Sequence, residues 1–135
     1  MRYLGIDFGL KRVGLALTDP SGTMAFPYKT LHRTTRRQFF EDLLAVMDQE
    51  KVEGVVLGLP LDLEGRETET TRQVINFKNS LARRTDLPIY LVNEALSSFE
   101  AEQTLTSTGM KKKKQKPVLD QMAAIIILES FLASR

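Results

Sequence analysis

The sequence has no cysteine, a single histidine and no long apolar run. The absence of cysteine excludes a disulfide framework and a thiolate zinc site, and it is compatible with a reducing compartment. The longest apolar run, residues 122–128, is far too short to span a bilayer, and no charged-then-apolar leader opens the chain. We therefore expect a soluble, cytoplasmic protein with no membrane partner. The histidine, His32, follows a predicted strand and is expected at the surface rather than as a catalytic base.

The 135 residues are enough for one hydrophobic core, so we expect a single domain over residues 1–135. The net charge is only +2, but the positive charges are clustered. The clusters are Arg33, Arg36 and Arg37; Arg83 and Arg84; and the lysine run, Lys111, Lys112, Lys113, Lys114 and Lys116. Such clusters are typical of surfaces that bind nucleic acid, although solvated helix faces and an exposed loop would explain them as well.

The hydrophobic pattern predicts an α/β domain. Short apolar runs bounded by turn residues predict strands at residues 3–8, 13–18, 25–31, 55–57 and 89–92. Helical spacing and capping residues predict helices over residues 34–51, from about residue 70, over residues 97–108, and from Pro117 onward. Short connections make the first three strands an antiparallel meander, and Pro27 places the third at a sheet edge. The later strands should run parallel to the first, which gives a mixed sheet.

Asp7 is an acid inside an otherwise apolar strand. A buried carboxylate must be paired, hydrogen-bonded or bound to a cation, since leaving it alone is costly. Gly9 and Gly14 let the backbone turn and let a bulky group approach. Glu94 follows a later strand, and ligands in such sheets bind beyond the carboxyl ends of the parallel strands. We therefore expect Asp7 and Glu94 at the same sheet edge.

Asp120 is an acid on the inner face of the last predicted helix. It shares that face with Ala123, Ala124, Ile127 and Phe131. The small alanines would bring the helix close to the sheet, and Asp120 close to the first strand. The alternative is an ordinary first-turn acid, stabilised by the helix dipole. Three carboxylates suit Mg²⁺ or Mn²⁺, and two such ions about 4 Å apart support phosphodiester cleavage.

Four segments carry a family resemblance. They are residues 4–16 (LGIDFGLKRVGLA), 56–65 (VLGLPLDLEG), 94–97 (EALS) and 120–128 (DQMAAIIIL). Together they resemble the YqgF/RuvX family, ribonuclease H-like proteins described as Holliday-junction resolvases and as nucleases that mature the 5′ end of pre-16S ribosomal RNA. The resemblance implies a ribonuclease H-like fold, with a five-stranded mixed sheet flanked by helices. It also implies that Asp7, Glu94 and Asp120 form the catalytic, metal-binding set, with a divalent metal and a structured nucleic-acid substrate.

The chain departs from the family pattern at three positions. Asn93 and Ala95 stand where the family has aspartate and arginine, and Leu10 stands where it has threonine. The three acids are kept, so we expect the protein to be active. We expect the three departures to weaken substrate binding or to lower the rate. The residues expected to bind nucleic acid are Lys11, Arg12, Arg72, Lys111, Lys112, Lys113, Lys114 and Lys116. The lysine run is expected as a mobile loop over the active edge; for Arg72 a solvent-facing role is the alternative.

The sequence leaves several functions open. The first is metal-dependent cleavage of structured RNA, with precursor ribosomal RNA and pre-ribosomal particles as partners. The second is cleavage of four-way DNA junctions, which normally requires a homodimer, whereas the first is compatible with a monomer. The third is a non-catalytic RNA-binding module. The fourth is an actin-like ATPase, which needs a second lobe that 135 residues do not supply.

Overall fold

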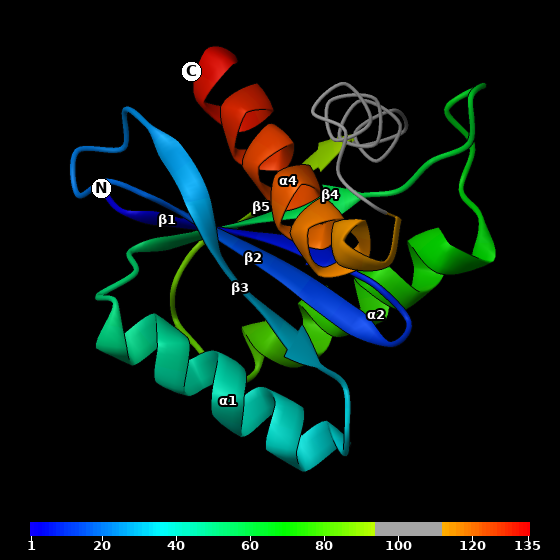
Figure 1. Cartoon of the computed structure of the whole chain (residues 1–135), viewed down its shortest axis with the longest axis horizontal. Coiled ribbons are helices and arrows are strands. Elements are labelled where there is room, and N and C mark those ends of the chain that lie inside the picture. The colour runs from blue at the N-terminus through cyan, green and yellow to red at the C-terminus, as the bar shows by residue number, and fades with distance from the viewer. Residues whose placement is uncertain (94–111) are drawn as a thin grey trace.

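The computed structural model describes residues 1–93 and 112–135, and for residues 112–118 it describes the backbone alone (Figure 1). The strands in these residues are β1 (Tyr3–Phe8), β2 (Arg12–Thr18), β3 (Ala25–His32), β4 (Gly54–Leu59) and β5 (Ile89–Asn93). The helices are α1 (Arg36–Gln49), α2 (Glu69–Ala82) and α4 (Lys112–Ala133). The predicted strands all exist, with bounds that differ from the prediction by at most two residues.

The strands form one mixed sheet in the order β3-β2-β1-β4-β5. β2 is antiparallel to both β1 and β3, whereas β4 is parallel to both β1 and β5. The prediction of a meander followed by parallel strands is therefore confirmed, as is the edge position of the strand that contains Pro27. The register of β2 against β3 shifts between Leu15 and Ala16, where Pro27 is the next partner. A proline has no N–H to donate, so an irregularity at this point is expected.

The helices cover the two faces of the sheet (Figure 1). α1 and α2 pack on one face, where the buried residues of β1 are Leu4, Ile6 and Phe8. α4 packs on the opposite face, where Tyr3 belongs to a second apolar cluster. Successive side chains of a strand point to opposite faces, so Gly5 and Asp7 face α4 together with Tyr3. This alternation decides on which side of the sheet the candidate site lies.

Glycines let α4 approach this face closely. A Cβ atom placed on Gly14 would lie 2.1 Å from the backbone oxygen of Asp120, and one on Gly5 would lie 2.5 Å from the Cγ atom of Leu128. Ala123 and Ala124 are buried as predicted. The close approach thus depends on small residues on both elements, since a side chain at either glycine would meet α4.

The prediction was wrong about where the last helix begins. α4 begins at Lys112 and contains Pro117, whereas the sequence suggested a start at the proline. Lysine and glutamine are good helix formers, which favours a helix over the residues that precede the proline. Pro117 costs this helix one backbone hydrogen bond but does not end it. The lysine run from Lys112 to Lys116 is therefore helical in its backbone, not a loop. Asp120 lies in the third turn, and the first-turn explanation of this acid is wrong.

Some predictions fall outside the described residues, namely the helix over residues 97–108, Glu94 and Lys111. His32 is exposed, as predicted. None of the helices in the two described ranges combines the length and the apolar character that crossing a membrane requires.

Candidate active site

Asp7 lies near the carboxyl end of β1 and is half-buried. Its partner across the antiparallel pair is Gly14 of β2. Residues directly opposite each other in such a pair present their side chains on the same face of the sheet. The carboxylate of Asp7 is therefore on the face that α4 covers, beside the glycine that α4 contacts.

Asp120 reaches the same place from α4. A Cβ atom on Gly14 would lie 2.3 Å from the backbone carbon and 2.8 Å from the Cβ atom of Asp120. Gly14 is thus the common neighbour of Asp7, which pairs with it, and of Asp120, which packs over it. The structure brings these two predicted site residues together, although they come from the first strand and the last helix.

An arginine lies beside Asp120. The Nε atom of Arg12 donates to the Oδ2 atom of Asp120 at 2.8 Å. The two side chains are 32% and 19% exposed, so the pair is partly shielded from water. We expected Arg12 to bind nucleic acid, and the reasoning from sequence missed this ion pair. The signal was present: Arg12 precedes Gly14 by two residues in β2, so both face α4.

A further hydrogen bond fixes α4 on the sheet next to this ion pair. The Nε2 atom of Gln121 donates to the hydroxyl of Thr30 in β3 at 3.1 Å. Asp120 and Gln121 therefore anchor adjacent points of α4 to two neighbouring strands. These contacts hold the carboxylate of Asp120 in one position over the sheet.

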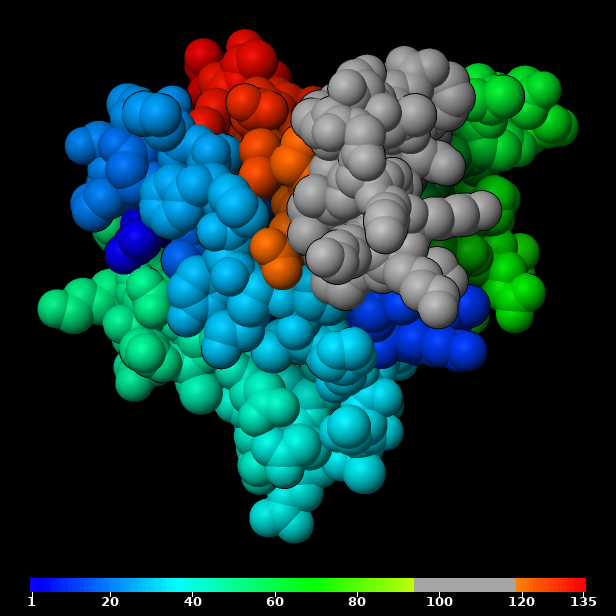
Figure 2. Space-filling model, in the orientation of Figure 1, coloured from blue at the N-terminus to red at the C-terminus, as the bar shows by residue number. Residues whose placement is uncertain are grey.

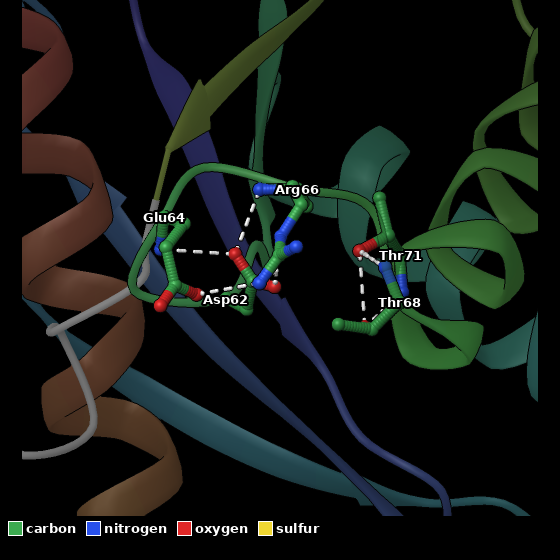
Figure 3. Close-up of polar contacts among 5 residues, drawn as sticks. All are labelled: Asp62, Glu64, Arg66, Thr68 and Thr71. Atoms are coloured by element: carbon green, nitrogen blue, oxygen red, sulfur yellow. Dashed lines mark hydrogen bonds and ion pairs between the residues drawn. The ribbon is translucent and has the colours of Figure 1, made fainter.

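The loop between β4 and α2 is organised around Asp62 (Figure 3). The Oδ1 atom of Asp62 accepts the backbone N–H groups of Glu64 and Arg66, and its Oδ2 atom pairs with the Arg66 Nε atom at 3.2 Å. Arg66 also pairs with Glu64 at 3.1 Å. The guanidinium of Arg66 is thus neutralised inside its own loop. It is a poor candidate for a contact with phosphate.

The start of α2 is fixed by a reciprocal cap between Thr68 and Thr71 (Figure 3). The hydroxyl of Thr71 also donates to the carbonyl oxygen of Pro60, which ties the helix to the end of β4. Arg72 follows Thr71 and is exposed, as is Lys11. In the described part of the chain neither Lys11 nor Arg72 forms an ion pair. Both cations face solvent, which leaves their predicted contact with nucleic acid open.

The predicted third acid, Glu94, comes directly after Asn93, the last residue of β5, and lies outside the described residues. In the described ranges no three acidic or histidine side chains gather closely enough to hold a metal ion. The two described carboxylates, Asp7 and Asp120, are the hard oxygen donors that Mg²⁺ and Mn²⁺ prefer. The donor chemistry therefore fits such an ion, with Glu94 as the predicted third ligand.

Comparison with known proteins identifies the family of the chain. Residues 1–134 match the family model RuvX, described as Holliday junction resolvase. The chain is 56% identical to a protein of Maridesulfovibrio salexigens over 98% of both chains. It is 53% identical to a protein of Nitratidesulfovibrio vulgaris (strain Miyazaki F), over 98% of this chain and 93% of that one. Both relatives carry the name "Putative pre-16S rRNA nuclease".

Two solved structures show the same fold. Thermus thermophilus RuvC in complex with a Holliday junction substrate aligns with a TM-score of 0.58 at 17% identity, over 99% of this chain and 96% of that one. The Fowlpox virus resolvase in complex with Holliday junction DNA aligns with a TM-score of 0.60 at 15% identity, over 99% and 98% of the two chains. The predicted ribonuclease H-like architecture is therefore confirmed.

Proposed function

The chain belongs to the RuvX family, and from this premise we propose that it is a metal-dependent endonuclease that processes the 5′ end of pre-16S ribosomal RNA. The observation that carries the proposal is the convergence of Asp7 and Asp120 at Gly14. Acids from two distant parts of the chain meet on one sheet face, where α4 approaches most closely. Two carboxylates gathered at one point of an otherwise apolar face repel each other, and a bound cation would offset that repulsion.

The proposed ligands of Mg²⁺ or Mn²⁺ are Asp7, Glu94 and Asp120. A pair of such ions, when bound, supplies an activated water and stabilises the leaving oxygen of a phosphodiester. Arg12 holds the carboxylate of Asp120 in position through the ion pair described above. The same guanidinium lies beside the acidic site, so it is suited to orient a substrate phosphate.

Other cations are proposed to hold the nucleic-acid backbone. Lys11 and Arg72 are exposed on the segments that follow β1 and β4, respectively. The lysine run, Lys111, Lys112, Lys113, Lys114 and Lys116, precedes Asp120, and from Lys112 on its backbone belongs to α4. Contacts of this kind attract phosphates without reading sequence, so binding should weaken steeply as the salt concentration rises.

The names of the curated relatives favour RNA as the substrate. We further propose pre-ribosomal particles as partners and the cytoplasm as the location. Cleavage of four-way DNA junctions is the second candidate, favoured by the family description and by two resolvases of the same fold bound to junctions. A junction resolvase must cut two strands. A homodimer would therefore accompany the second activity, and a monomer is compatible with the first.

The test is cleavage of a precursor 5′ segment of 16S ribosomal RNA and of a synthetic four-way DNA junction, with Mg²⁺ or Mn²⁺. Asp7→Asn, Glu94→Gln and Asp120→Asn should each abolish cleavage, whereas Glu129→Gln should not. Glu129 is a matched control because it is an exposed acid of the same helix α4. RNA cleavage that follows this pattern supports the proposal, and paired cuts in the junction support the second candidate. Salt-sensitive RNA binding without any cleavage would refute the enzyme and support a binding module.

A further inference from the structure

A pocket of about 570 Å³ lies on the sheet face opposite α4, between α1 and α2. It begins at the carboxyl end of β1, where Phe8 follows Asp7 in sequence and points to the other face. In Figure 2 the tip of the β1–β2 hairpin (blue) lies beside the connection from β3 to α1 (cyan), and residues of both segments line the pocket. The volume is in the range of pockets that bind small ligands.

The inner wall of the pocket is aromatic. It consists of Phe8, Phe39, Phe40 and Phe77. The rings of Phe8 and Phe77 are stacked, with centroids 4.3 Å apart and an interplanar angle of 14°. The guanidinium of Arg33 lies 4.5 Å from the centroid of the Phe8 ring, and its Nη1 atom donates to the carbonyl oxygens of Gly9 and Leu10. The guanidinium of Arg33 therefore lies at the end of the stack formed by Phe77 and Phe8, at the pocket rim.

Three more arginines converge on Ser80, whose side chain also lines the pocket. The hydroxyl of Ser80 accepts from Arg36 at 2.7 Å and from Arg83 at 3.1 Å, and its backbone oxygen accepts from Arg84 at 2.8 Å. Ser80 is only 6% exposed. Within the described ranges none of these guanidinium groups lies within 4.0 Å of a carboxylate oxygen. Like charges repel when they are gathered without a counter-ion, so this cluster favours an anion.

The remaining lining residues provide hydrogen-bonding groups. Gln73 and Asn76 of α2 offer side-chain amides, and Thr34 and Thr35 offer hydroxyls before α1. An amide presents one acceptor and two donor hydrogens, a combination that matches the edge of a nucleobase. Aromatic rings and guanidinium planes are the surfaces on which unpaired bases stack. The pocket thus joins groups for a base and groups for a phosphate.

We propose that this pocket binds one unpaired nucleotide, with its base packed between the edges of the aromatic wall and the guanidinium plane of Arg33, and with its phosphate on Arg36. The source of the nucleotide is the substrate strand, an assignment that rests on the proposed function. A strand that passes over the β1–β2 hairpin reaches both the pocket and the face that holds Asp7, since Phe8 and Asp7 are neighbours. The pocket then places an unpaired nucleotide beside the cleavage site.

The test uses the full chain carrying Asp7→Asn, so that RNA stays intact. Titration with adenosine monophosphate and with a short single-stranded RNA should each shift the NMR signals of the side-chain amides of Gln73 and Asn76. In this background Arg36→Gln should weaken RNA binding roughly tenfold. The matched control is Arg37→Gln, which removes the same charge from the next residue. Arg37 pairs with Glu41 and does not line the pocket.

A second variant keeps every charge and blocks the space. Asn76 is exposed on α2, so Asn76→Trp fills the pocket without changing the core. It should weaken RNA binding roughly tenfold or more while the melting temperature stays near that of the parent. RNA that displaces the mononucleotide identifies a strand nucleotide, whereas mononucleotide binding that RNA does not displace identifies a free nucleotide as the ligand.

The proposal is refuted if the amide signals of Gln73 and Asn76 do not shift. It is also refuted if Arg36→Gln and Arg37→Gln weaken RNA binding equally. The proposed function fails separately. Cleavage is compared in chains that keep Asp7. If these chains cleave RNA but Arg36→Gln and Asn76→Trp cleave as fast as Arg37→Gln, the proposed pocket is refuted and the proposed nuclease activity is not. If neither substrate is cleaved but the nucleotide still shifts these amide signals, the proposed nuclease activity is refuted and the proposed pocket is supported.

Discussion

Gly14→Ala should separate α4 from the sheet at the candidate site. The added Cβ atom would lie 2.1 Å from the backbone oxygen of Asp120, whereas ordinary contact begins at 3.4 Å. A backbone oxygen cannot rotate away as a side chain can, so α4 must move by more than a few tenths of an ångström. Overpacking of this kind costs up to about 3 kcal/mol, which lowers Tm by on the order of 10 °C in a chain of this size. A displacement of about 1 Å between catalytic groups can cost roughly 100-fold in rate.

The assay compares Tm and single-turnover RNA cleavage for Gly14→Ala and Gly54→Ala. Gly54 is a matched control because a Cβ atom there would lie 2.9 Å from the ring of Tyr3, away from both acids. Both variants should lose stability, but only Gly14→Ala should lose cleavage at a temperature where both are folded. An unchanged Tm for Gly14→Ala would refute the close approach of α4. Equal cleavage by the two variants would refute the link between this contact and the reaction.

Three further predictions follow from single contacts. Arg12→Gln removes the cation beside Asp120; without metal it should cost less than about 1 kcal/mol, and added Mg²⁺ should raise Tm more in the variant than in the wild type. Hydrogen bonds lower the pKa of Asp19 from 3.8 to about 2, and the backbone N–H of Met24 makes the largest contribution. Ionised Asp19 therefore stabilises the folded protein above pH 3.8, and this stabilisation is lost as the pH falls toward 2. In acid unfolding curves, the stability difference between wild type and Asp19→Asn should shrink across that window. Thr68→Ala should destabilise the protein by about 1 kcal/mol in urea unfolding, whereas Thr68→Ser should not, because serine keeps the cap.

The sheet could be predicted because its physical signals are local. A short apolar run bounded by turn residues marks β1, and its predicted bounds match the structure. Pro27 cannot donate to a central strand, so the edge position of β3 follows from one residue. The start of α4 could not be predicted in this way. The lysines before Pro117 carry no apolar period, and proline is typical of the first turn of a helix, so the sequence pattern places the start of the helix at Pro117.

The candidate site was predictable in part. Asp7 and Asp120 stood out because each is an acid on an apolar face, and this argument needs no knowledge of contacts. The ion pair of Arg12 with Asp120 joins residues 108 positions apart, and it depends on which turn of α4 lies over Gly14. Strand alternation places Arg12 on the correct face, but the helix register comes from packing against two glycines. Sequence patterns do not predict which turn of α4 lies over which glycine of the sheet.

The wide separation of Arg12 and Asp120 has a consequence for synthesis, because a chain emerges from the ribosome beginning with its N-terminus. The five strands in residues 1–93 all precede α4, so the sheet can form before α4 covers its second face. That face is apolar, and it carries Asp7 without Asp120. A chain that stalls or is cut before α4 would therefore expose this apolar face and be prone to associate with other chains. Under the proposed function it would also be inactive, since it lacks Asp120. Asp7 and Asp120 can therefore come together only after α4 has been synthesised.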